Sequence, residues 1–178
     1  MIELVSLDPT IWLDIRYATT NNFTGRKVYT EPRAFLQRPA AEALVRAHKV
    51  LQQQGYRLKI YDAYRPLAVQ KIFWKVKPDE RYIADPTNGS RHNRGMAVDL
   101  TLTDLQGKEV SMPTPYDDFT PKASATYNDL PPEVIRHREI LQKAMVTEGF
   151  AIFPTEWWHF DYKGWEKFPV LDIPFPPR

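Results

Sequence analysis

The chain has 178 residues, and its 24 Lys and Arg against 22 Asp and Glu leave a net charge of +2, too small to indicate nucleic-acid binding. Cysteine is absent, which excludes disulfides, thiolate metal ligands and a cysteine nucleophile, so any metal site must use nitrogen and oxygen ligands. The length and a hydrophobic content of 43% predict one domain over residues 1–178, with a Pro-rich tail from about residue 168.

The N-terminal segment has no basic start and no apolar run of signal-peptide length. Nothing in the chain approaches the roughly 18 consecutive apolar residues of a membrane span. We therefore expect no membrane partner and a cytoplasmic location. A signal removed ahead of Met1 would instead indicate the periplasm.

Three elements are predicted in the first half of the chain. Apolar and small residues recur at helical spacing over residues 39–54, with Pro39 at the start and Gly55 just past the end. Residues 57–62 alternate with a period of two, which is typical of a strand. Pro66 is placed to begin a helix that continues to about Trp74.

The second half begins with a long loop over residues 75–89. Residues 97–103 are rich in strand formers and, through a turn at 104–107, predict a hairpin with 108–110. Residues 111–130 look irregular, residues 131–148 have helical spacing ended by Gly149, and residues 150–162 predict one or two strands. Because helices and strands do not alternate regularly, we predict an α+β fold with a small antiparallel sheet flanked by helices.

Two short segments contain a possible metal site. His92 and Asp99 offer an imidazole and a carboxylate, and Gly95 between them allows a sharp turn that brings the two side chains together. Glu156 and His159 offer a second such pair. Two neutral nitrogens and one carboxylate oxygen can hold zinc at three corners of a tetrahedron, leaving the fourth for water. A spare glutamate beside that water is what metal-assisted hydrolysis requires.

Each segment alone also has an ordinary structural explanation. The first is compatible with a hydrogen-bonded turn, and in a regular strand Glu156 and His159 would face opposite sides unless the strand bends. The remaining histidines, His48 and His137, fall inside predicted helices, where we expect surface or half-buried positions. The two segments are more informative together, because they supply three ligands and one base with nothing redundant.

The two segments also carry a family resemblance. The patterns Ser-x-His-x6-Asp and Glu-x-x-His are those of zinc peptidases that share the D,D-carboxypeptidase and hedgehog-like fold. From about residue 3 to 170 the chain resembles the D-alanyl-D-alanine dipeptidases, a group that includes the vancomycin-resistance dipeptidase. Pro113-Thr114-Pro115 departs from the glycine expected there and could alter a substrate-capping loop. The narrower matching motifs are Arg16–Thr19, Asn22–Gly25, Tyr61–Pro66, Gly95–Leu102 and Tyr116–Phe119.

The resemblance implies roles for individual residues. It makes Glu156 the catalytic base and places Arg65 over the scissile carbonyl, where a salt bridge to Asp62 is the alternative role for Arg65. It places Asp117 near the substrate amine, although the sequence does not separate Asp117 from Asp118. The zinc ligands, for one Zn²⁺ per chain, would be His92, Asp99 and His159, and the dipeptide contacts would be Ser90, Asp117 and Tyr17.

The implied activity is zinc-dependent hydrolysis of D-Ala-D-Ala to two D-alanines by a metal-activated water. One alternative is a D,D-carboxypeptidase or peptidoglycan endopeptidase of the same wider set. Another is a zinc-stabilised binding domain without catalysis, which Glu156 and Arg65 disfavour because a structural site needs neither.

We expect Trp157 and Trp158 to pack in the core and orient ligands rather than contact substrate. The sequence predicts no particular oligomeric state.

Overall fold

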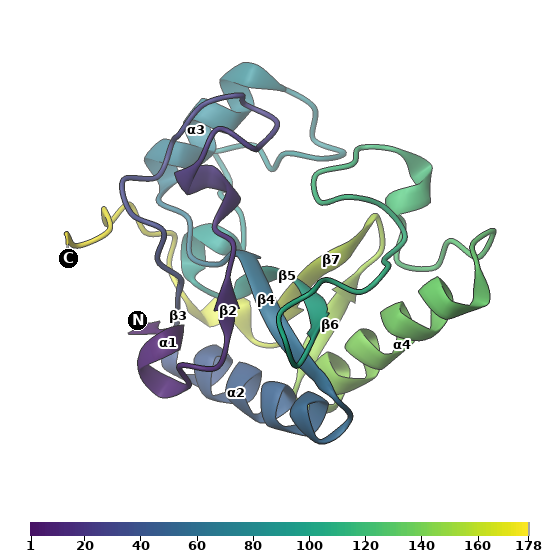
Figure 1. Cartoon of the computed structure of the whole chain (residues 1–178). Coiled ribbons are helices and arrows are strands. Elements are labelled where there is room, and N and C mark those ends of the chain that lie inside the picture. Colours follow the sequence, from purple (N-terminus) through teal and green to yellow (C-terminus); the bar gives the residue numbers. More distant parts are fainter. Residues whose placement is uncertain (178) are drawn as a thin grey trace.

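A computed structural model describes residues 1–177 and is built around a five-stranded sheet with the strand order β2-β4-β5-β7-β6 (Figure 1). The β2–β4 pair is parallel and the other three pairs are antiparallel. The predicted α+β class is therefore confirmed, with one parallel pair at the β2 edge. The strands are β2 (Trp12–Leu13), β4 (Tyr56–Asp62), β5 (Ala97–Asp104), β6 (Phe150–Phe153) and β7 (Glu156–Tyr162).

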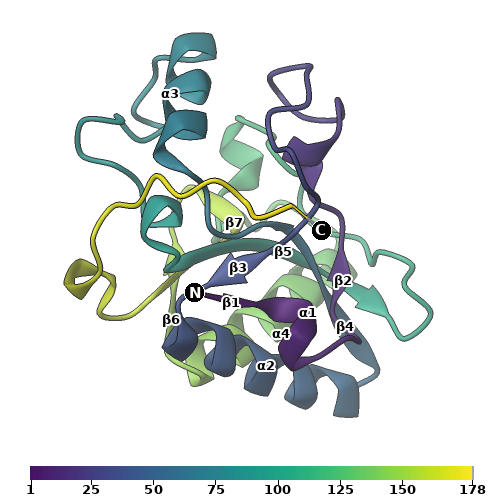
Figure 2. The ribbon, with the colours of Figure 1, turned by 90° about the vertical axis from the view of Figure 1, so that its left-hand side faces the viewer.

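Two long helices, α2 (Arg38–Gln53) and α4 (Pro132–Thr147), lie side by side along one face of the sheet (Figures 1 and 2). In α2 the apolar stripe predicted from the sequence is buried, and Gly55 just past its end has a φ of 86°, which favours glycine. Both helices start and end within two residues of the predicted bounds. The shorter elements are α1 (Leu4–Leu7), α3 (Leu67–Val76), a two-stranded sheet of β1 (Ile2–Glu3) and β3 (Phe35–Leu36), and 3₁₀ turns at Arg16–Ala18, η2 (His92–Arg94), Pro121–Ala123 and Trp165–Lys167.

The expectation for the two helical histidines was wrong. The side chain of His48 is fully buried, because it lies on the same face of α2 as Leu44 and Leu51. Its Nδ1 accepts a hydrogen bond from the Leu58 amide at 3.1 Å, and its Nε2 lies 2.9 Å from the Thr10 hydroxyl. His137 is also buried. Its Nδ1 lies 2.9 Å from the carbonyl of Ser111.

The C-terminal strap, residues 168–177, is packed rather than loose (yellow in Figure 2). The amide of Leu171 donates to the carbonyl of Asn93 at 2.8 Å, and the carbonyl of Leu171 accepts from the amide of Leu67 at 3.2 Å. The ring of Phe175 is buried in an aromatic cluster whose other members are Tyr29, Phe35 and Tyr64. The strap therefore connects the start of α3 to η2.

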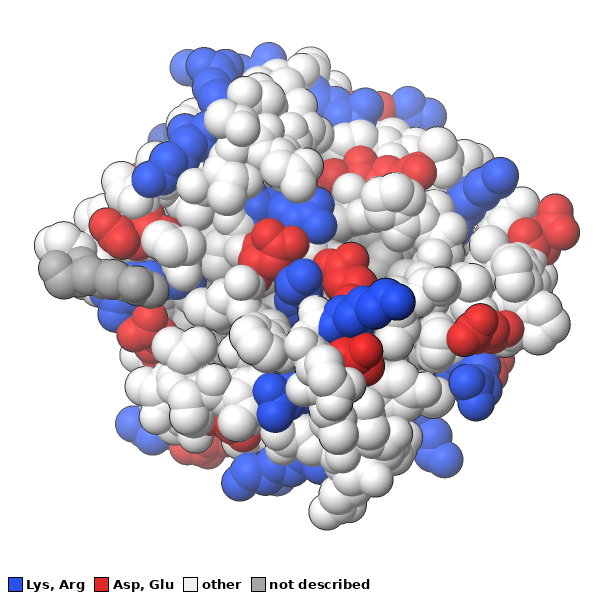
Figure 3. Space-filling view, viewed as in Figure 1, with Lys and Arg blue, Asp and Glu red and all other residues white. Residues whose placement is uncertain are grey.

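Charged side chains of both signs are interspersed over the face seen in Figure 3. Among residues 1–177, every helix is too short or too polar to cross a bilayer.

Candidate metal centre and active site

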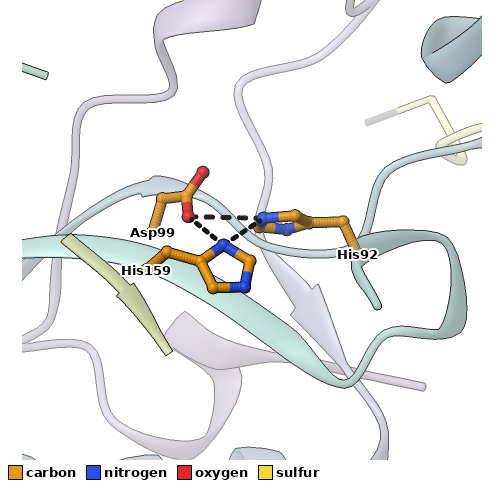
Figure 4. Close-up of side chains that lie close together, drawn as sticks. All are labelled: His92, Asp99 and His159. Atoms are coloured by element: carbon orange, nitrogen blue, oxygen red, sulfur yellow. Dashed lines mark hydrogen bonds and ion pairs between the residues drawn. The ribbon is translucent and has the colours of Figure 1, made fainter. Parts of the chain in front are cut away.

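Three ligand atoms converge where β5 and β7 run side by side (Figure 4). Asp99 of β5 and His159 of β7 are direct partners across the antiparallel ladder. His92 comes from η2, and Gly95 then turns the chain into β5 with a φ of 66°. The Asp99 Oδ1 atom lies 3.0 Å from His159 Nδ1 and 3.3 Å from His92 Nε2, and the two nitrogens are 3.2 Å apart.

These spacings fit a tetrahedral ion. Bonds of about 2.0–2.1 Å to zinc place neighbouring ligand atoms about 3.3–3.4 Å apart. The Nδ1 atom of His92 lies 2.7 Å from the carbonyl of Ala63, which can only accept, so Nδ1 carries the hydrogen and Nε2 a lone pair. Likewise the Nε2–H of His159 donates to Asp161 at 2.7 Å, which leaves its Nδ1 lone pair facing the centre. With these tautomers, two nitrogen lone pairs and a carboxylate oxygen face one point, and a metal cation there could bind all three.

The local charges favour such a cation. Burial alone would lower the pKa of His159, but hydrogen bonds to Asp161 and Asp99 raise this pKa to about 10. Burial alone would raise the pKa of Asp99, yet the adjacent imidazoles of His92 and His159 lower it. Surroundings that stabilise a proton on an imidazole stabilise a metal cation by the same attraction.

Glu156 is the first residue of β7 and lies beside the three ligands. The β6–β7 ladder is irregular between Ile152 and Phe153, and Phe153 pairs with Glu156. Glu156 and His159 can face the same side only if the strand is distorted, and this irregularity provides that distortion. As a result, Glu156 Oε2 lies 3.8 Å from His159 Nδ1. Burial raises the pKa of Glu156 to about 8, with the charges of Asp99 and Asp117 adding to the increase while His159 opposes it.

Arg65 follows β4 and makes the salt bridge to Asp62 that was the alternative to a position over the scissile carbonyl. Its Nε and Nη2 atoms donate to Asp62 Oδ2 at 3.0 and 2.7 Å, and Nη1 donates to Gln70 Oε1 at 2.8 Å. The salt bridge therefore exists, while the same side chain lines the cavity at the ligand cluster. Tyr29 completes the arrangement by donating to Asp62 Oδ1 at 2.6 Å. The guanidinium is thus buried and fixed in direction.

The cavity beside the ligands has a volume of about 130 Å³. Asp117 lines it, and its φ of 61° is the one positive value outside glycine among residues 1–177. The Tyr17 hydroxyl donates to Asp117 Oδ2 at 2.9 Å, and burial raises the pKa of Asp117 to about 7. Asp118 lies outside the lining and accepts from the Thr120 amide at 2.9 Å. The predicted site residues in the lining are Tyr17, Arg65, Ser90, His92, Asp99, Asp117, Glu156 and His159.

Pro113, Thr114 and Pro115, where the sequence departs from the family pattern, do not line the cavity, whereas Asp117 and Phe119 further along the same loop do. The hydroxyl of Thr114 instead accepts from the indole N–H of Trp157 at 2.9 Å.

Trp157 and Trp158 are both buried in the core, as predicted, and Trp158 also lines the cavity.

Two residues next to the candidate metal ligands have no role in the sequence prediction. Tyr116 donates its hydroxyl to Asp99 Oδ2 at 2.8 Å, and Asp161 accepts from His159. Asp161 lies two residues after His159, so a strand places both on one face, and that spacing is a signal available in the sequence.

The fold and this cluster define a domain in which His92, Asp99 and His159 could hold a single metal ion, with the Glu156 carboxylate beside them. A family model described as D-ala-D-ala dipeptidase matches residues 1–172, and the chain belongs to this peptidase family.

Curated relatives agree with this assignment. A D-alanyl-D-alanine dipeptidase of Escherichia coli is 35% identical, over 96% of this chain and 89% of the relative. The Enterococcus faecium protein of the same name is 29% identical, over 93% and 92% respectively. The Streptomyces coelicolor protein of that name is 32% identical, over 98% and 95%. Among solved structures, the LD-carboxypeptidase LdcB superposes with a TM-score of 0.49 at 20% identity, over 74% of this chain and 61% of that one.

Proposed function

We propose that this protein is a zinc-dependent dipeptidase that hydrolyses D-Ala-D-Ala to two D-alanines by a metal-activated water. The observation that carries the proposal is the mutual spacing of 3.0–3.3 Å among the ligand atoms of His92, Asp99 and His159, with Glu156 beside them. Zinc held there would lower the pKa of a coordinated water to roughly 7 and polarise the substrate carbonyl. Membership of the D-Ala-D-Ala dipeptidase family supports the choice of substrate.

Glu156 is the general base of the proposed reaction. Its carboxylate accepts a proton from the attacking water and then passes this proton to the nitrogen of the leaving D-alanine. Its burial favours the protonated form, as the raised pKa of about 8 indicates, so the carboxyl group can hold the proton between the two transfers.

Arg65 stabilises the charge that develops on the carbonyl oxygen. Its guanidinium is buried, lines the cavity and is held by Asp62 and Gln70, so little reorganisation is needed as negative charge grows. Fixed donors of this kind are typically worth about 3–4 kcal/mol of transition-state stabilisation.

Asp117 binds the free amine of the dipeptide in this proposal, with Tyr17 fixing its carboxylate and Ser90 contributing a further contact. An acylated amine would leave the Asp117 carboxylate without a charged partner, with only the Tyr17 hydroxyl donating to it, so a dipeptide would be preferred to a longer peptide. The small cavity also favours a dipeptide over the longer stem peptides that a carboxypeptidase or endopeptidase would accept.

The test is D-alanine release by zinc-loaded protein from D-Ala-D-Ala, N-acetyl-D-Ala-D-Ala and a muramyl pentapeptide. We expect release from the free dipeptide only, a strong loss in Asp117→Asn, and no comparable loss in the neighbouring control Asp118→Asn. Release from the blocked or longer substrates would instead make the protein a carboxypeptidase. No release from any substrate, with zinc bound, would support a non-catalytic binding domain.

A further inference from the structure

Two loops far apart in the sequence meet over the cavity. One follows α3 and carries Tyr82, and the other carries Phe119, two residues after Asp117. Both rings line the cavity, and they contact each other with centroids 5.0 Å apart and planes tilted by 47°. The two loops therefore contact each other in the wall of the cavity that Asp117 also lines.

A cation lies close to both rings. The ammonium of Lys77, at the end of α3, is 5.1 Å from the Tyr82 centroid and 4.9 Å from the Phe119 centroid. Both distances are within the range of cation–π attraction. Phe119 also packs edge-on against Phe23, with centroids 5.6 Å apart. We name Lys77, Tyr82 and Phe119 the aromatic latch.

The loop that carries Tyr82 is fixed at both ends. At one end the Lys77 amide donates to the Phe73 carbonyl at 2.9 Å. At the other end the buried Gln70 side chain donates to the Ala84 carbonyl at 2.8 Å, and its oxygen accepts from Arg65 at 2.8 Å. The position of the latch is therefore tied to the guanidinium that lines the same cavity, so the latch forms a defined wall.

We propose that the aromatic latch sets the maximum length of the substrate on its amino side by steric exclusion. This inference rests on the proposed function, because it places the substrate amine at Asp117. With the amine at Asp117, a residue added before the dipeptide would extend toward the wall that Tyr82 and Phe119 form, and their ring contact would leave no space for it in this proposal. The two features would select different properties of the substrate. Asp117 would select a positively charged amine, and the latch would limit the length of the peptide.

The experiment compares kcat/KM for D-Ala-D-Ala with kcat/KM for Gly-D-Ala-D-Ala, which keeps a free amine but is one residue longer. Phe119→Ala should raise the ratio of tripeptide to dipeptide activity by about tenfold or more, within the range by which pocket shape discriminates substrates. The same rise is expected in an Asp117→Asn background, because the two selections are independent. Trp12→Ala, which truncates an exposed aromatic far along the sheet, is the matched control and should leave the ratio unchanged.

Two substitutions of Lys77 test whether its positive charge contributes to the latch. Lys77→Arg should keep the wild-type ratio, whereas Lys77→Met should raise it severalfold, and equal ratios in the two would remove Lys77 from the latch.

Phe119→Leu, which keeps apolar packing, replaces Phe119→Ala if the latter does not fold. An unchanged ratio in folded, zinc-loaded Phe119 variants that still hydrolyse D-Ala-D-Ala would overturn the latch and leave the dipeptidase intact. Absence of dipeptide hydrolysis by the wild-type protein would instead overturn the proposed function.

Discussion

Asp99 and His159 face each other directly across the β5–β7 ladder, and the atoms that would bind metal are 3.0 Å apart. Main-chain hydrogen bonds of the sheet therefore fix two of the three candidate ligands before any metal arrives. Sites built on strands hold their geometry more closely than sites on loops. A bound ion would in turn fasten β5 to β7, so metal binding and folding stability should be linked.

Loss of one ligand should remove that link. In wild-type protein we expect one zinc per chain and a melting temperature that falls when a chelator is added, because a ligand at 100 times its dissociation constant adds about 2.7 kcal/mol of stability. His92→Ala should bind zinc far more weakly and show little thermal shift. Metal analysis and calorimetry measure both effects. His137→Ala, another buried histidine, is the control that should keep the zinc response, and tight one-to-one binding in His92→Ala would contradict the assignment.

Replacement of the base should separate catalysis from metal binding. Glu156→Gln should keep zinc and the fold, since Glu156 lies at the end of the hairpin rather than among the three converging atoms. It should lower kcat by about 10²–10⁴-fold, the usual contribution of a general base. Steady-state kinetics with metal analysis of the same sample tests this. A variant that loses its zinc would show that Glu156 is a ligand.

The direction of the Arg65 donors should matter more than their charge. Arg65→Lys keeps a cation but cannot reproduce the donations to Asp62 and Gln70, so we expect kcat to fall about 10²–10³-fold. Stability should fall by about 1–3 kcal/mol, because the buried Asp62 loses charged donors. Kinetics and urea unfolding measure the two effects. Arg33→Lys, which alters a guanidinium paired with Glu3, should leave kcat near the wild-type value.

The sequence identified the chemistry of the site better than its geometry. Motifs named His92, Asp99, Glu156 and His159, which the structure brings together, but they could not reveal the irregular β6–β7 pairing that lets Glu156 reach His159. That irregularity depends on which residues pair across two strands, and a local pattern does not encode pairing.

Burial was the second quantity that local patterns predicted poorly. Polarity suggested an exposed or half-buried His48, whereas the helix face on which it lies is covered by the sheet. Similarly, the proline content of the strap gave no indication that Phe175 enters the core, because its contacts come from residues more than 100 positions earlier.

The buried His48 predicts a pH dependence of stability that is separate from the metal site. Burial lowers its pKa below the unfolded value of about 6.5, with Arg57 adding to the decrease and Asp8 opposing it. The unfolded chain therefore binds this proton more readily, so stability is complete above about pH 6.5 and is lost as the pH falls through the folded-state pKa. The slope from this group is at most about 1.4 kcal/mol per pH unit.

The measurement is the free energy of unfolding at pH 7.5 and 5.5 in excess zinc, for wild type and His48→Gln. The variant should be less stable at pH 7.5, and the difference between the two proteins should narrow at pH 5.5. A constant difference would mean that His48 keeps the same protonation state in the folded and unfolded chains.

The C-terminal strap has an evolutionary consequence. Its links to Asn93 and Leu67 are made by the peptide groups of Leu171, which any residue except proline could supply. Selection on this segment should therefore act mainly on its length, on the ring at Phe175 and on the Asp172 carboxylate, which accepts from the Ala68 amide at 2.8 Å, while the exposed side chains at Pro169 and Ile173 change more freely. Insertions and deletions between Phe168 and Phe175 should then be rarer among descendants of this protein than substitutions there.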